Sequence, residues 1–311
     1  MLDEYERPPM HLLTAPDFPV TAFLQGPLRR VLAVHGIVER ATLPACGSDF
    51  AAINMALAAL HVSKAVPWGP LVFVYLLPRV DIDGRLLPAA VGEIKTFLSA
   101  LNLVALNLLV VAGKGRRSAC LDADLVAVHG GTDALRSMRL DATAVDELRA
   151  GLCRVSLSRK PTTRAVLRRA ARACAAASVG APAPAGSAVE PVSGYDNGGG
   201  ADAAVTVEHM LPRSPNVDSK WVKTFPHADT RKGLTDCLGN LTLLTEGGNR
   251  AASNIDVERK IRDVYQRSDA GLVAPLLVSV MATRVWDADA IATRQRYLFD
   301  LLMQPYEVLT G

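Results

Sequence analysis

The sequence has few aromatic residues and almost no excess of charge of one sign. Phe, Trp and Tyr make up 5% of its 311 residues, and 34 Lys and Arg stand against 31 Asp and Glu, a formal net charge of +3. This balance excludes a uniformly basic nucleic-acid coat, so binding to nucleic acid must depend on local clusters of charge. Half of the residues are hydrophobic, which excludes a chain that is disordered throughout.

Cysteine is also scarce, and its spacing matches neither a disulfide framework nor a zinc cluster. No C-x-x-C pair occurs, and the number of cysteines is odd, which argues against a disulfide framework and against a structural zinc cluster. A reducing, cytoplasmic location is therefore the expectation. The five cysteines are Cys46, Cys120, Cys153, Cys174 and Cys237.

Targeting and membrane signals are equally weak. The first nine residues are acidic and contain no apolar run, unlike a signal peptide. The longest apolar stretch, Phe97–Gly113, is interrupted by Ser99, Asn102 and Asn107. Because a membrane helix needs about 20 residues with few polar interruptions, we expect a buried helix and no membrane contact.

Residues 1–177 have the pattern of a mostly helical region. Apolar residues recur at positions 50, 53, 57 and 60, which predicts a helix with one buried face, and Asp49 is a plausible N-cap. Pro88 is placed to begin another helix, and Thr143 begins one that runs to about Cys153. Residues 126–129 could form a short strand. Residues 178–203 are rich in Pro, Gly, Ala and Ser and predict a linker or disordered loop.

A basic cluster precedes that linker. Residues 154–172 carry seven Arg and Lys and no acid. From Pro161 onward the segment has helical spacing, and Arg164, Arg168 and Arg172 fall at i, i+4 and i+8 on one face. These side chains could contact a DNA backbone, each displacing counterions, or form a solvated helix face.

The residues with chemical potential are in the last third. Val205 and Val207 alternate with Thr206 as in a strand that ends in Glu208-His209 and is closed by Pro212. A second strand-like run, 238–244, has Asn240 at its start. Gly247 and Gly248 predict a turn, after which Asn249 could cap a helix that runs through Lys260.

This order of strand, loop, strand and helix, with Glu-His, Asn and Asn at the junctions, resembles an HNH nuclease motif. Residues 204–300 resemble the GmrSD-type HNH family, the nuclease domain of modification-dependent restriction enzymes. The motifs behind the resemblance are Glu208-His-Met-Leu-Pro212 and Gly239-Asn-Leu-Thr-Leu243. The predicted fold is mainly α with a small α+β part: a helical N-terminal region (1–177), the linker (178–203), and a C-terminal HNH ββα-metal nuclease domain (204–311) flanked by helices.

Phosphodiester hydrolysis assigns a role to each residue in this pattern. Glu208 and Asn249 supply the oxygen donors that one divalent cation prefers, Mg²⁺ first and Mn²⁺ second, and no organic cofactor is expected. His209 takes the proton of the attacking water, and Asn240 holds that base or its loop through its amide. Glu208 and His209 would face opposite sides of a regular strand, so the strand must end or twist near Met210. Lys260 either contacts DNA or lies on a solvated face.

The predicted function is therefore a metal-dependent DNA endonuclease in restriction or phage defence. Duplex DNA, with or without modified bases, is the expected substrate, and a separately encoded sensor or nucleotidase is a candidate partner. The resemblance implies an N-terminal nucleotidase domain with the signature Asp-Gly-Gln-Gln-Arg in full-length relatives. The nearest match here is Asp83-Gly-Arg85, which lacks the Gln-Gln-Arg part of that signature. Two alternatives stay open: a DNA-binding or assembly subunit with a weak or inactive site, and a nuclease directed at RNA.

Overall fold

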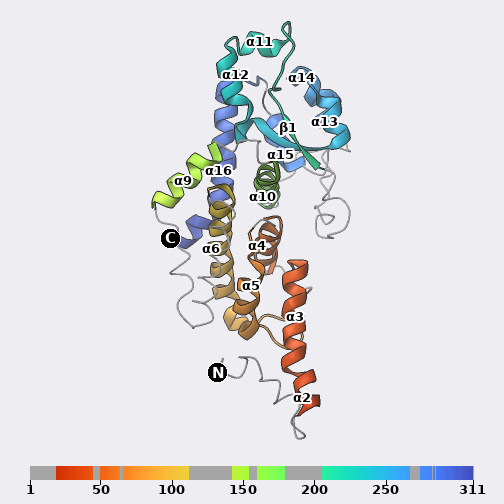
Figure 1. Ribbon diagram of the computed structural model, residues 1–311, viewed down its shortest axis with the longest axis vertical. Coiled ribbons are helices and arrows are strands. Elements are labelled where there is room, and N and C mark those ends of the chain that lie inside the picture. Colours follow the sequence, from red (N-terminus) through yellow and green to blue (C-terminus); the bar gives the residue numbers. More distant parts are fainter. Residues whose placement is uncertain are drawn as a thin grey trace.

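A computed structural model gives the fold, and Figure 1 draws it as a ribbon. The predicted cap at Asp49, the predicted strand at 126–129, the basic residues Arg154 and Arg159, and nearly all of the segment 178–203 lie outside the residues it describes. Those described are 19–44, 50–63, 66–111, 142–153, 160–178, 205–266, 274–281, 283 and 285–310.

The first helices pack around one long apolar helix, α6. Twelve of its 20 residues are buried and they lie on most sides of the helix, so α6 is enclosed by other elements, among them α4, α9 and α16. The expectation of a buried helix in this stretch is confirmed. The helices of this part are α2 (Val20–Gln25), α3 (Pro27–Arg40), α4 (Ala51–His61), α5 (Gly69–Leu76), α6 (Val91–Val110) and α9 (Ala142–Cys153).

The segment Pro88–Val110 is long and apolar enough to cross a membrane by length and composition. In its most apolar window, however, 67% of the residues are buried inside the protein. The polar side chain of Asn102 is also satisfied internally, since its Nδ2 donates to the carbonyl oxygens of Ala56 (3.0 Å) and Leu98 (2.9 Å). These features are those of a core helix.

Helix α10 (Lys160–Ser178) connects the N-terminal helices to the rest of the protein. It contacts α4 and α6 on one side and β1, β2, α15 and α16 on the other, and Figure 1 shows it between α4 and the strands. Its Arg169 is buried and donates to Ser63 Oγ (2.8 Å), Asn102 O (2.7 Å) and Asn102 Oδ1 (2.8 Å). Because these acceptors are all uncharged, burial lowers the pKa of Arg169 to about 10.

Two antiparallel strands form the sheet of the described chain. Strand β1 (Val205–His209) pairs with β2 (Leu241–Thr245), with Val205 opposite Thr245 and His209 opposite Leu241. A 3₁₀ turn at Leu238–Asn240 leads into β2. The connection between the strands carries the short helices α11 (Lys220–Thr224) and α12 (Ala228–Thr235).

Helix α13 (Glu246–Ala252) follows β2 directly and contacts both strands. The predicted turn at Gly247 and Gly248 is wrong, because both glycines belong to the first turn of α13. Thr245 is its N-cap, and the Thr245 Oγ1 accepts from the Gly248 amide at 3.1 Å. The remaining elements are α14 (Val257–Lys260), a π-helical turn (Ile261–Tyr265), α15 (Ala274–Met281) and α16 (Ala288–Thr310).

One hydrophobic core extends across both sides of α10. It contains Leu57 of α4, Leu101 of α6, Leu167 of α10, Leu241 of β2 and Leu298 of α16. A mostly helical protein with a small sheet is therefore confirmed, whereas the ββα-metal arrangement and the division into 1–177 and 204–311 stay predictions. The N-terminal helices and the hairpin are in contact through this shared core.

Candidate functional site

The end of β1 positions the Glu-His pair. The strand ends at His209, as the sequence predicts, and the chain then bends at Met210. Asn240 fixes that bend, since the Met210 amide donates to the Asn240 backbone oxygen at 3.1 Å and the Leu211 amide donates to Asn240 Oδ1 at 2.8 Å. The backbone immediately after His209 is thereby held in place.

The Asn240 side chain also fixes the segment of chain that leads into β2. Its Nδ2 donates to the backbone oxygens of Leu211 (3.0 Å) and Thr235 (2.8 Å), and its Oδ1 accepts from Trp286 Nε1 at 3.2 Å. The side chain is fully buried, and its hydrogen bonds join the residue after the bend to the end of α12. These are the contacts that a residue holding the loop of a base would make, and Trp286 itself is a core residue.

The imidazole of His209 contacts an acid that sequence reasoning missed. His209 Nε2 lies 3.2 Å from Asp236 Oδ1, and Asp236 directly follows α12. An ionised carboxylate only accepts hydrogen bonds, so Nε2 carries the proton and Nδ1 is the unprotonated nitrogen of the neutral ring. Among the described residues, Nδ1 has no hydrogen-bond partner. Nδ1 is therefore the nitrogen that could accept a proton.

Arg213 completes this group. Its Nη2 lies 3.1 Å from Asp236 Oδ1 and 3.4 Å from Oδ2, and its Nε lies 3.3 Å from Oδ1. The side chains of His209, Asp236 and Arg213 are 17%, 40% and 54% exposed, so the group opens toward solvent through Arg213. We call these three residues the His209 group. The sequence signal that could have found them is an acid just before the turn that leads into β2.

Burial lowers the pKa of His209 below its ordinary value. The hydrogen bond to Asp236 raises this pKa, and the nearby charge of Arg213 lowers it. The result of these effects is a ring that is neutral at physiological pH, which is the state that a general base needs.

Glu208 faces the interior, away from the His209 group. Its Oε1 accepts from Lys260 Nζ at 2.7 Å and from the Tyr265 hydroxyl at 3.3 Å, and Lys260 Nζ also donates to the His209 backbone oxygen at 2.7 Å. Lys260 is 0% exposed and Glu208 is 3% exposed. Burial raises the pKa of Glu208 and lowers that of Lys260, while each partner's charge opposes the shift of the other.

The burial of Lys260 corrects both sequence interpretations of that residue. A side chain with no exposed surface is neither a DNA contact nor part of a solvated helix face.

Asn249 also differs from expectation, because it lies inside α13 and does not cap it. Its Nδ2 donates to Thr206 Oγ1 (2.8 Å) and to the Val207 carbonyl oxygen (2.9 Å), which ties α13 to β1.

The predicted basic row on α10 is half-buried. Arg164, Arg168 and Arg172 are each partly exposed, and Arg172 donates to the backbone oxygen of Ala58 near the end of α4. A cation at a helix C-terminus interacts favourably with the backbone oxygens there. Arg172 therefore has a structural partner, and DNA contacts by this row stay a prediction.

The cation that the HNH resemblance implies can be tested against these contacts. Glu208 and Asn249 have oxygen donors of the type that Mg²⁺ prefers. The Glu208 carboxylate, however, is already neutralised by Lys260, and a divalent ion bound to it would meet the ammonium's charge in a buried setting. As arranged here, the pair does not fit a divalent cation. Within the described ranges, no group of three or more His, Cys, Asp and Glu could hold a metal.

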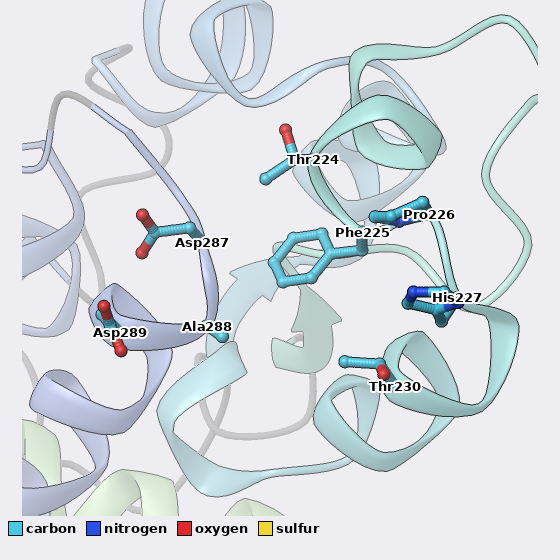
Figure 2. Close-up of a pocket in the computed structure, with 8 residues that line it drawn as sticks. All are labelled: Thr224, Phe225, Pro226, His227, Thr230, Asp287, Ala288 and Asp289. Atoms are coloured by element: carbon cyan, nitrogen blue, oxygen red, sulfur yellow. The ribbon is translucent and has the colours of Figure 1, made fainter.

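A cavity of about 240 Å³ lies between α11, α12 and the start of α16. Phe225 is one of the residues that line it, and Figure 2 shows His227 and Thr230 on one side of the Phe225 ring and Asp287 and Asp289 on the other. None of the residues that line it belongs to the His209 group.

The turn before β2, which carries Asn240, has a buried support on α16. Gly239 allows the turn before β2 to approach this helix, since an added Cβ would lie 2.2 Å from the Ile291 backbone oxygen. Arg294 of α16 then donates to the carbonyl oxygens of Gly239 and Leu241, both at 2.8 Å. These contacts fix the backbone on both sides of Asn240.

Comparison with known proteins agrees with the motifs. Residues 160–301 match the family model for the GmrSD restriction endonucleases, C-terminal domain. The resemblance predicted from the sequence is confirmed over this part of the chain, and it indicates a restriction-type nuclease. The match includes α10, the described strands and the His209 group. Neither the curated proteins nor the solved structures gave a match.

Proposed function

We propose that this protein is a DNA endonuclease of the HNH type, acting in restriction or phage defence, in which His209 is the general base. One observation carries the proposal: within the region that matches the nuclease family, His209 Nε2 is held by Asp236 while Nδ1 has no hydrogen-bond partner among the described residues. A base needs an unprotonated nitrogen that is fixed in direction, and this contact provides both properties.

In the proposed reaction, a water oxygen attacks the phosphorus of a phosphodiester, and its proton passes to His209 Nδ1. The bond between phosphorus and the leaving ester oxygen breaks, and solvent protonates that oxygen. Negative charge increases on the phosphoryl oxygens during the attack, and a preorganised positive group stabilises it. Arg213 is the exposed cation of the His209 group and can provide part of this charge.

No step is assigned to a metal ion, because Lys260 already neutralises Glu208. The requirement for one Mg²⁺ or Mn²⁺ stays a prediction, as do modified DNA as the substrate and a separate sensor or nucleotidase as partner. Each of these can be varied in a cleavage assay.

The test is cleavage of modified and unmodified supercoiled plasmid by the full chain, with Mg²⁺, with Mn²⁺ and with chelator. We expect nicked or linear product from the wild type and none from His209→Ala. His227→Ala is the matched control, since this exposed histidine lies outside the His209 group, and it should cleave normally. Equal cleavage by His209→Ala and the wild type would overturn the proposal. A parallel RNA substrate distinguishes the RNA-directed alternative.

A further inference from the structure

We infer that Asp236 is a positioning residue for His209: it holds the imidazole by Nε2 so that Nδ1 is presented to the attacking water, and Arg213 holds Asp236 in turn. The inference rests on the proposed function and adds to it a residue that the motif does not contain.

Both carboxylate oxygens of Asp236 are held by neighbouring side chains. Its Oδ1 is shared between His209 Nε2 (3.2 Å) and Arg213 Nη2 (3.1 Å), while Oδ2 lies 3.4 Å from the same Arg213 nitrogen. An imidazole with one nitrogen held by an oriented carboxylate cannot rotate freely about its side-chain bonds. This is the arrangement in which a carboxylate keeps a general base in one tautomer and one orientation.

The position of Asp236 is unfavourable for the local fold, which argues against a purely structural role. The residue is the C-cap of α12, where the backbone oxygens make the helix end partly negative. An acid at this end is repelled by those oxygens and disfavours the helix. The contacts with His209 and Arg213 offset that cost, so the acid is explained by what it contacts.

The backbone around Asp236 is fixed by other residues. The Thr235 carbonyl, immediately before it, accepts from the buried Asn240 amide at 2.8 Å. The Asp236 side chain itself is 40% exposed and fills no core position. Asp236→Ala should therefore fold, and removing the carboxylate should change the direction of His209 while leaving the helix end in place.

The experiment compares Asp236→Ala with Asp229→Ala, which removes an exposed acid from the same helix. Plasmid cleavage gives kcat and KM, each with added sodium formate and with sodium chloride at equal ionic strength. Formate is a small carboxylate that can enter the space left by an exposed side chain. We expect Asp236→Ala to lower kcat by about 10²–10⁴-fold. KM should be unchanged or lower, because Arg213 is released from its acid.

Formate should restore part of the kcat of Asp236→Ala, and chloride should not; Asp229→Ala should match the wild type in both salts. A kcat of Asp236→Ala equal to that of Asp229→Ala, or no recovery with formate, would overturn the inference. A second measurement is independent of cleavage. The proton NMR spectrum of the wild type should contain a downfield imidazole N–H signal that is missing from both His209→Ala and Asp236→Ala.

The two measurements separate the two claims. If the wild type does not cleave but shows the N–H signal, the proposed function fails and the contact between the residues stands. If the wild type cleaves and lacks the signal, the positioning role of Asp236 is wrong.

Discussion

Lys260 Nζ lies 2.7 Å from Glu208 Oε1, and both side chains are removed from solvent. The same ammonium donates to the backbone oxygen of His209, so this ion pair ties α14 to the last residue of β1. Two charges taken out of water are costly unless they are paired and hydrogen-bonded, and Tyr265 supplies a further donor to Glu208. The pair fixes the end of β1 from the interior.

We predict that Lys260→Met destabilises the protein by about 3–5 kcal/mol, because it leaves the Glu208 carboxylate buried without its partner. The free energy of unfolding from urea titration measures this loss. Lys223→Met removes an exposed lysine on α11 and should stay within about 0.5 kcal/mol of the wild type.

The double variant Glu208→Gln with Lys260→Met should be more stable than the two single losses together imply, by at least about 1 kcal/mol. Purely additive losses would mean that the two side chains do not interact, contrary to the contact described here. Each single change also removes hydrogen bonds to other groups. Those losses cancel in the double-mutant cycle, so the difference that remains reports on the pair itself.

The buried guanidinium of Arg169 gives a second stability prediction. It donates to Ser63 and twice to Asn102, which joins α10 to α6 and the end of α4. Arg169→Met removes the guanidinium donor from the Ser63 hydroxyl and the Asn102 side-chain oxygen in a buried setting and should cost about 2–4 kcal/mol. Thermal unfolding measures the change, with Lys95→Met, an exposed lysine on α6, as the matched control. An unchanged midpoint for Arg169→Met would contradict this role.

The sequence predicted the elements whose signals are local. Apolar spacing predicted the helix beginning near Phe50, and Pro88 marked the start of the segment that becomes α6. The end of β1 at His209 followed from its alternation and from Pro212. The segment at Gly247 was mistaken for a turn because the competing signal, Thr245 as an N-cap, is a single residue.

Contacts between distant residues could not be predicted. Asp236 is 27 residues from His209, and their meeting depends on the path of the chain through α11 and α12. Lys260 is 52 residues from Glu208, and a lone lysine in a helix is normally at the surface. Only the folded chain shows that the Glu208 carboxylate in β1 pairs with the Lys260 ammonium and offsets the cost of burying it.

Arg213 gives a prediction about DNA binding. It is the exposed cation of the His209 group, and we expect it to contact a phosphate of the substrate. Arg213→Gln should raise KM and reduce the slope of log affinity against log salt by about one unit. Fluorescence anisotropy with labelled duplex DNA measures that slope, with Lys95→Met as a control far from this group in sequence. An unchanged slope would show that Arg213 does not contact phosphate.

The pH dependence of cleavage follows from the environment of His209. Burial lowers the pKa of this imidazole below 6.5, and only its neutral form can accept the proton of the attacking water. Activity should therefore fall as the pH decreases, through a midpoint below the ordinary pKa of histidine. The measurement is kcat/KM against pH, which reports the pKa of the free enzyme's base.

Arg213→Gln tests the sign of this prediction. The positive charge of Arg213 disfavours a second positive charge on the imidazole, so its removal should raise the pKa of His209 and shift the acid limb toward higher pH. Asp236→Asn should shift the limb the other way, because it removes the negative charge that favours the protonated ring. Shifts in the same direction for the two variants, or a wild-type midpoint above 6.5, would show that a group other than His209 controls the acid limb.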